Sequence, residues 1–149
     1  MRIVDHEKRV VVLLVEDSDL YRNGLAHALE TLHASVYAAK THAAARELIG
    51  LHWDEIDAIL LDACVEPPYL FYDAPELLKE LARMNAKREP AVTIIGLASD
   101  KQMRQRLMRD GCTGALSKNR ELVEFLPELL SDLLEQHLIT ATFKKPDPA

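Results

Sequence analysis

Short, uninterrupted apolar runs set the strongest limit on the fold of this chain. Val10–Val15 contains only β-branched and leucine side chains, Ala58–Leu61 is a second apolar run, and Ala91–Leu97 is apolar except for Thr93. Such runs are typical of strands buried on both faces, which occur in parallel sheets covered by helices. Weaker segments at Ser35–Ala39 and Ala115–Ser117 complete a set of five predicted strands.

Helical segments separate these strands, and most of them begin near a residue that can cap a helix. The capping candidates are Ser18 or Asp19, Thr41, Asp73 and Asp100. A proline and a glutamate follow Asp73 within three residues, as is typical of a helix start. Strands that alternate with helices in this way predict an α/β doubly wound parallel sheet with right-handed crossovers and five helices.

The pattern predicts one domain over residues 10–139, preceded by a polar leader at 1–9 and followed by a tail at 140–149. The last helix carries leucines at helical spacing on both sides of Pro127, where we expect the helix either to restart or to kink. From about Thr140 the periodic pattern ends, which predicts a frayed tail.

Composition excludes several classes of function. The 149 residues carry a formal net charge of −6 and no basic tract, which argues against direct DNA binding. No apolar run approaches the ~18 residues of a membrane span, and no signal peptide precedes the first strand. The two cysteines lack metal-binding spacing, and the six histidines show no ligand spacing with one another. We therefore expect a cytoplasmic protein without a membrane partner.

Charged residues follow three of the predicted strands directly. Glu16 and Asp17 follow the first, Asp62 follows the third, and Lys118 follows the fifth. Because ligands bind outside the carboxyl ends of parallel strands, these four side chains are expected to share one crevice. Three carboxylates and one ammonium suit a hard divalent cation together with a phosphoryl group. The sequence therefore predicts a protein that is phosphorylated on an aspartate.

Three segments, VVLLVEDSD, DAILLDACVEP and GCTGALSK, in this order and spacing, resemble the receiver domain of response regulators in two-component signalling. The resemblance covers residues 10–137 and implies a flavodoxin-like sheet of strand order 2-1-3-4-5. It implies that Asp62 accepts a phosphoryl group from a histidine kinase or phosphotransfer protein and that Lys118 contacts that group. It also implies a Mg²⁺ ion held by Glu16, Asp17, Asp62 and the backbone carbonyl of Cys64.

The chain departs from this family at the positions that transmit phosphorylation. The family usually has a hydroxyl residue at the end of the fourth strand, where this chain has Ala98 followed by Ser99. The usual aromatic of the fifth strand is Ala115, and the usual proline after the lysine is Asn119. The loop after the third strand is about four residues longer than usual and contains the aromatic-rich segment 67–72. Those aromatics either cover the crevice, form a contact patch or pack on the domain itself.

The leading hypothesis is a stand-alone receiver domain that is phosphorylated on Asp62 and then alters its contacts with a downstream protein target. Ser99 is a candidate to supply the missing hydroxyl, although a shift of one residue normally reverses the face of a side chain. A second hypothesis is a phosphorylation-independent protein-interaction module with the receiver fold, in which Ala98 and Ala115 replace the switch residues. The sequence also leaves a homodimer open.

A third hypothesis is an aspartate-nucleophile phosphatase of the haloacid dehalogenase type. Such enzymes typically have a second acid two residues after the nucleophile, and here that residue is Cys64. We therefore expect a protein that is not an enzyme. Cys64 also raises the question of redox chemistry, for which an unreactive core cysteine is the simpler interpretation. The basic segment from Lys101 to Arg109 is either a docking face for an acidic partner or a solvated helix face.

Overall fold

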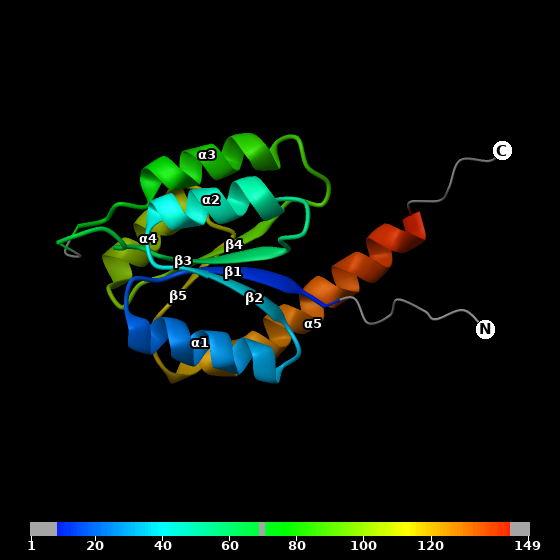
Figure 1. Cartoon of the computed structure of the whole chain (residues 1–149), viewed down its shortest axis with the longest axis horizontal. Helices are drawn as coiled ribbons and strands as arrows, with labels where there is room; N and C mark the ends of the chain where they lie inside the picture. Colours follow the sequence, from blue (N-terminus) through cyan, green and yellow to red (C-terminus); the bar gives the residue numbers. More distant parts are fainter. Residues whose placement is uncertain (1–8, 69–70, 144–149) are drawn as a thin grey trace.

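The computed structural model describes residues 9–68 and 71–143, and it describes the backbone alone at 120–121 and 137–143. Its centre is a five-stranded parallel sheet of order β2-β1-β3-β4-β5 (Figure 1). This order confirms the predicted flavodoxin-like α/β architecture. The strands are β1 (Val11–Val15), β2 (Ser35–Ala39), β3 (Ala58–Asp62), β4 (Thr93–Leu97) and β5 (Gly114–Leu116).

Five helices cover the two faces of the sheet. In Figure 1, α1 and α5 lie on one face, and α2, α3 and α4 lie on the other. The helices are α1 (Asp19–Thr31), α2 (His42–His52), α3 (Pro75–Asn85), α4 (Lys101–Arg109) and α5 (Arg120–Phe143). Among the described residues, no helix is long and apolar enough to cross a membrane.

The central strands are buried on both faces, as their unbroken apolar sequence predicts. Alternate side chains of β1 and β3 enter different cores. Leu13 and Ile59 belong to the core shared with α2, α3 and α4. Leu14 and Leu60 belong to the core shared with α1 and α5. The two cores fix the register of the strands, and the register in turn fixes which residues meet at the carboxyl edge of the sheet.

Three of the predicted helix caps are confirmed. The side chains of Ser18, Thr41 and Asp100 accept hydrogen bonds from backbone N–H groups in the first turns of α1, α2 and α4. The prediction that Asp73 caps α3 is wrong, because the N-cap residue is Ala74 and makes no side-chain cap bond. The Asp73 carboxylate instead accepts backbone N–H bonds from Val65 and Glu66. It therefore stabilises the long loop that follows β3.

Helix α5 passes Pro127 without interruption, so of the two predicted outcomes the restart at this proline is wrong and the kink stays a prediction. The proline is exposed, and buried leucines flank it on both sides in the sequence. Their packing compensates for the one backbone hydrogen bond that proline removes. The helix also continues through Thr140 to Phe143, where the sequence predicts a frayed tail. The predicted leader (1–9), except Arg9, and the tail after Phe143 lie outside the described residues.

Gly96 in β4 is required by the close approach of α4 to the sheet. A Cβ atom at this position would lie 2.7 Å from Leu107 Cδ1 and 3.0 Å from Leu107 Cβ. Leu107 is fully buried, so it has no free space into which to move. We expect Gly96→Ala to lower the free energy of unfolding by about 1–3 kcal/mol, as in other overpacked cores.

Gly50→Ala is the matched control for this substitution. Gly50 lies in α2, and a Cβ atom there meets nothing within 4 Å. Alanine favours helix more than glycine does by up to about 1 kcal/mol, so this variant should be at least as stable as the wild type. Urea unfolding measures both variants. Equal stability of Gly96→Ala and the wild type would contradict the packing of Leu107 against Gly96.

Candidate functional site

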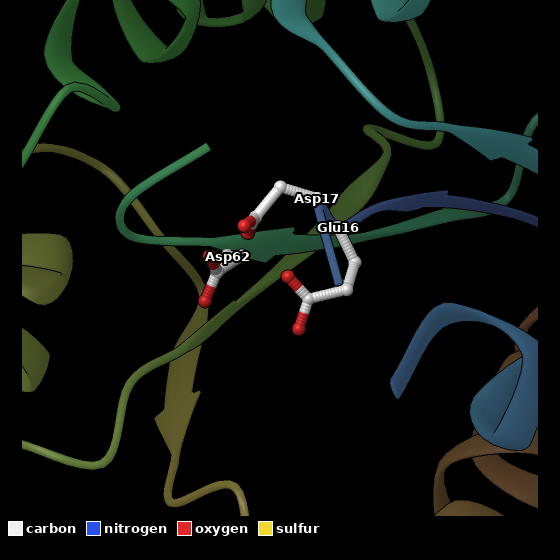
Figure 2. Close-up of side chains that lie close together, drawn as sticks. All are labelled: Glu16, Asp17 and Asp62. Atoms are coloured by element: carbon white, nitrogen blue, oxygen red, sulfur yellow. The ribbon is translucent and has the colours of Figure 1, made fainter. Parts of the chain in front are cut away.

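The strand order brings the four predicted site residues together at the carboxyl edge of the sheet. Glu16 and Asp17 directly follow β1, Asp62 ends the neighbouring β3, and Lys118 follows β5. Oxygen atoms of the three carboxylates lie within 4.8 Å of one another. Figure 2 shows the three carboxyl groups pointing toward a common region. The four predicted residues therefore meet at one edge of the sheet, although Glu16 does not line the open cleft there.

Lys118 joins two of these carboxylates across the edge of the sheet. Its Nζ lies 2.5 Å from Glu16 Oε1 and 2.6 Å from Asp62 Oδ1. The Glu16 side chain is fully buried, the Asp62 side chain is 7% exposed, and the Lys118 side chain is 13% exposed. Charge-assisted hydrogen bonds of this kind are strong because little water competes for them.

The loop between β1 and α1 is fixed by the backbone and by an arginine. The N–H group of Glu16 donates to the carbonyl of Ala39 at 3.0 Å, which ties the loop to β2. Arg22 Nη1 donates to the carbonyls of Glu16 at 3.0 Å and Asp17 at 3.3 Å. The two acidic side chains therefore project from a rigid turn.

The electrostatics of the site show a deficit of positive charge. Burial raises the pKa of Glu16 to about 7, because the hydrogen bond from Lys118 only partly offsets burial and the nearby Asp62 adds to the rise. Burial also raises the pKa of Asp62, again against the effect of Lys118. Burial alone would lower the pKa of Lys118, but its hydrogen bonds to Asp62 and Glu16 raise it. Lys118 therefore stays charged, and it pairs with two of the three clustered carboxylates.

The residues present fit a hard divalent cation. Glu16 Oε2 is buried and has no hydrogen-bond partner within the described part of the chain. Among the described residues, one group of three side chains could hold a metal ion, and it consists of the carboxylates of Glu16, Asp17 and Asp62. Oxygen-only donors are the ligands that Mg²⁺ prefers. Glu16, Asp17 and Asp62 would hold the ion, and the additional carbonyl ligand at Cys64 stays a prediction.

An open cleft of about 440 Å³ lies beside the charged residues. Asp17, Asp62 and Lys118 line it together with residues of the loops that follow β3 and β4. Asp62 therefore borders a cleft that is open to solvent. Phe71 and Tyr72 do not line the cleft.

The aromatic loop after β3 does not cover the site where the structure describes it. The Tyr72 hydroxyl donates to Asp110 Oδ2 at 2.7 Å, so this ring packs on the domain itself at the end of α4. Phe71 is 70% exposed. Tyr69 and Leu70 lie outside the described residues.

The switch positions lie where the sequence predicts them, without the usual side chains. Ala98 is buried at the end of β4, and its N–H group donates to the carbonyl of Leu116 at 3.1 Å. Ser99 is exposed and lines the cleft. Ala115 in β5 packs against the core on the side of α2, α3 and α4. No hydroxyl occupies the position of Ala98, and no aromatic ring occupies that of Ala115.

Sequence reasoning missed two residues that shape the cleft. Arg104 Nη1 donates to the carbonyls of Ala98 and Ser99, both at 2.9 Å, and so fixes the loop after β4. The ring of Tyr21 lies 4.9 Å from Lys118 Nζ. The sequence carries no signal for these two contacts, and Arg104 reads there only as one of the basic residues of the segment from Lys101 to Arg109.

Cys64 lacks the environment of a reactive cysteine. Its Sγ donates to Met103 Sδ at 3.6 Å. Burial, with the nearby charges of Asp62 and Asp73, raises the pKa of its thiol to about 11. Cys112 is buried, and burial raises the pKa of its thiol to about 12. Both cysteines therefore suit packing roles.

Comparison with known proteins identifies the family of this chain. The model of the response regulator receiver domain matches residues 12–129, and the chain belongs to this family. Members of the family generally interact with kinases or phosphotransfer proteins and generally bind Mg²⁺ at an acidic pocket, which the three carboxylates provide here. Comparison with curated protein sequences gave no match.

Solved structures with the same fold come from distant relatives. The receiver domain of the Francisella response regulator 1452 is 20% identical, with a TM-score of 0.68 over 87% of this chain and 99% of that chain. A putative response regulator from Chloroflexus aurantiacus is 20% identical, with a TM-score of 0.67 over 86% and 99%. A receiver domain protein from Methanospirillum hungatei is 16% identical, with a TM-score of 0.68 over 88% and 98%.

The raised pKa of Cys64 predicts slow alkylation of the native protein. The thiolate is the reactive form, so a shift from 9.0 to about 11 lowers the thiolate fraction near pH 8 by about 100-fold. We expect iodoacetamide to modify Cys64 about 100-fold more slowly than it modifies the unfolded chain, with the rate rising as the pH approaches 11. Mass spectrometry of alkylated peptides measures this rate. Rapid modification of Cys64 would revive the redox interpretation.

Proposed function

We propose that this receiver domain accepts a phosphoryl group on Asp62 from a histidine kinase or phosphotransfer protein. The observation that carries the proposal is the placement of the Asp62 carboxylate, 2.6 Å from the Lys118 ammonium and beside an open cleft. Glu16 and Asp17 supply the further carboxylates that Mg²⁺ binding requires. Family membership supports the same function.

The chemistry follows from the charges of the site. An oxygen of the Asp62 carboxylate forms a bond to phosphorus, while the bond from phosphorus to the donor nitrogen breaks and its electron pair leaves with the donor imidazole. Lys118 donates hydrogen bonds to the phosphoryl oxygens as the group arrives. When bound, Mg²⁺ neutralises charge on the incoming oxygens and on the acidic cluster. The product is an acyl phosphate, which hydrolyses readily and suits a reversible signal.

The proposed role is that of an acceptor and not of a phosphatase acting on external substrates. An aspartate-nucleophile phosphatase needs a second acid for proton transfer near the nucleophile. The residue two positions after Asp62 is Cys64, whose raised thiol pKa makes it a poor proton donor. Exchange of phosphate with cytoplasmic signalling proteins is therefore the activity that we propose.

Intact-mass measurement tests the acceptor function. We expect incubation with a small acyl phosphate and Mg²⁺ to add one phosphoryl group to the wild type, and chelation of Mg²⁺ to prevent this. Asp62→Asn should gain nothing, because an amide is a poor nucleophile. Asp54→Asn is the matched control, because Asp54 is an exposed aspartate before β3, at the opposite edge of the sheet, and it should react as the wild type does.

Two outcomes would contradict the acceptor function. Phosphorylation of Asp62→Asn at the rate of the wild type would show that the site is wrong. A wild type that gains no phosphoryl group from the small donor, from a histidine kinase or from a phosphotransfer protein would remove the function altogether.

A second candidate is an interaction module whose contacts with a downstream protein, or with a second copy of this chain, do not depend on phosphorylation. It is favoured by Ala98 and Ala115, which lack the hydroxyl and the ring that respond to a phosphoryl group in the family. Arg104 adds a fixed loop after β4. In this case the structural response to phosphorylation stays within the charged cleft.

Hydrogen exchange distinguishes a domain whose structure changes on phosphorylation (the switched domain) from the phosphorylation-independent interaction module. Because Arg104 binds the carbonyls of Ala98 and Ser99, and because Ala98 and Ala115 lack the hydroxyl and the ring, we expect Mg²⁺ with beryllofluoride to change exchange rates at residues 98–117 by less than twofold. Slower exchange around Asp17 and Asp62 is the control that shows binding of the mimic. A change of tenfold or more at residues 98–117 would support the switched domain and contradict the second candidate.

A further inference from the structure

The cleft contains one aromatic side chain among its described lining residues, that of Tyr21. The Nζ atom of Lys118 lies 4.9 Å from the centroid of this ring, which is within the range of a cation–π interaction. We propose that Tyr21 is a positioning residue that holds the Lys118 ammonium beside Asp62 for phosphoryl transfer. This inference rests on the proposed function.

The ring completes the surroundings of the ammonium. A lysine ammonium has three N–H donors, and here two of them serve Glu16 at 2.5 Å and Asp62 at 2.6 Å. The Tyr21 ring is a third favourable neighbour of the ammonium, and it carries no charge. Although Lys118 lines an open cleft, its side chain is only 13% exposed.

The contact matters because the other partners of Lys118 change during the reaction. Phosphorylation converts one Asp62 oxygen into the bridging oxygen of an acyl phosphate, and the ammonium then has to contact the phosphoryl group. Lysine has a flexible four-carbon stem, so it loses orientation when a carboxylate partner is lost. The ring of Tyr21 takes no part in that exchange. It therefore restrains the ammonium before and after transfer.

Tyr21 is held by the same helix start that fixes the acidic residues. The Ser18 hydroxyl, which caps α1, accepts a hydrogen bond from the Tyr21 N–H group at 3.3 Å. The next residue, Arg22, donates to the carbonyls of Glu16 and Asp17. One rigid turn thus places both the carboxylates and the ring. The ring comes from α1, whereas β5 has Ala115 at the position where the family usually has an aromatic residue.

The experiment compares initial rates of phosphorylation by a small acyl phosphate in four proteins with Mg²⁺. The variants are Tyr21→Leu, which removes the ring, Tyr21→Phe, which keeps it, and Leu20→Ala. Leu20 is 82% exposed on the same turn and serves as the control for a change in the α1 surface. We expect Tyr21→Leu to be about three- to fivefold slower, the range of a partly exposed cation–π contact, and the other two variants to stay within twofold of the wild type.

A spectroscopic readout tests the contact without phosphorylation. Ring current from Tyr21 should shift the NMR signals of the Lys118 Hε protons upfield in the wild type and in Tyr21→Phe. The shift should disappear in Tyr21→Leu. Lys118→Met identifies the signals by their loss.

The outcomes separate this inference from the function on which it rests. A wild type that accepts no phosphoryl group overturns the proposed function and the role of Tyr21 with it. If the wild type is phosphorylated, three results would overturn the positioning role of Tyr21 and leave the proposed function standing. These are equal rates in Tyr21→Leu, equal slowing in Tyr21→Phe and Tyr21→Leu, or slowing of Tyr21→Leu only when the donor is a protein. The last result would assign Tyr21 to a docking surface.

Discussion

The two short ion pairs of Lys118 connect the chemistry of this protein to its fold. The ammonium reaches Asp62 and Glu16 because β3 lies between β1 and β4, and β4 pairs with β5. In the register of these strands, Val15 pairs with Leu61 and Asp62 pairs with Leu97. A slip of one residue in any of these strands would turn the charged side chain toward the wrong face. The apolar cores on both faces prevent such a slip, so core packing and site geometry have the same cause.

The same interaction explains why the site suits a metal ion and a phosphoryl group. Burying two carboxylates beside a half-buried third one is unfavourable, and a single ammonium compensates for only part of the cost. The raised pKa values of Glu16 and Asp62 and the unpartnered Glu16 Oε2 are the visible results. A divalent cation bound by these carboxylates would relieve this excess of negative charge and would favour the approach of a phosphoryl group. The side chains of this site thus carry more negative than positive charge.

Most of the sheet and the site could be predicted from the sequence, because their signals are local. Buried strands read as apolar runs, and charged residues directly after them fall at one edge of a parallel sheet. Contacts between distant side chains carry no such signal. Asp73 has the sequence of a helix cap, but its carboxylate binds the loop after β3. Pro127 reads as a break, but leucine packing on both sides keeps α5 continuous. The contact of Tyr21 with Lys118 joins residues far apart in the sequence and appears only in three dimensions.

A crystal structure of the domain with Mg²⁺ and beryllofluoride would test the central claim most directly, because beryllofluoride mimics the phosphoryl group of an acyl phosphate. The account predicts beryllium bonded to an Asp62 carboxylate oxygen, a fluoride in contact with Lys118 Nζ, and Mg²⁺ bound by carboxylate oxygens of the acidic cluster. Beryllofluoride bonded to another residue, or Mg²⁺ bound away from Asp17 and Asp62, would contradict it.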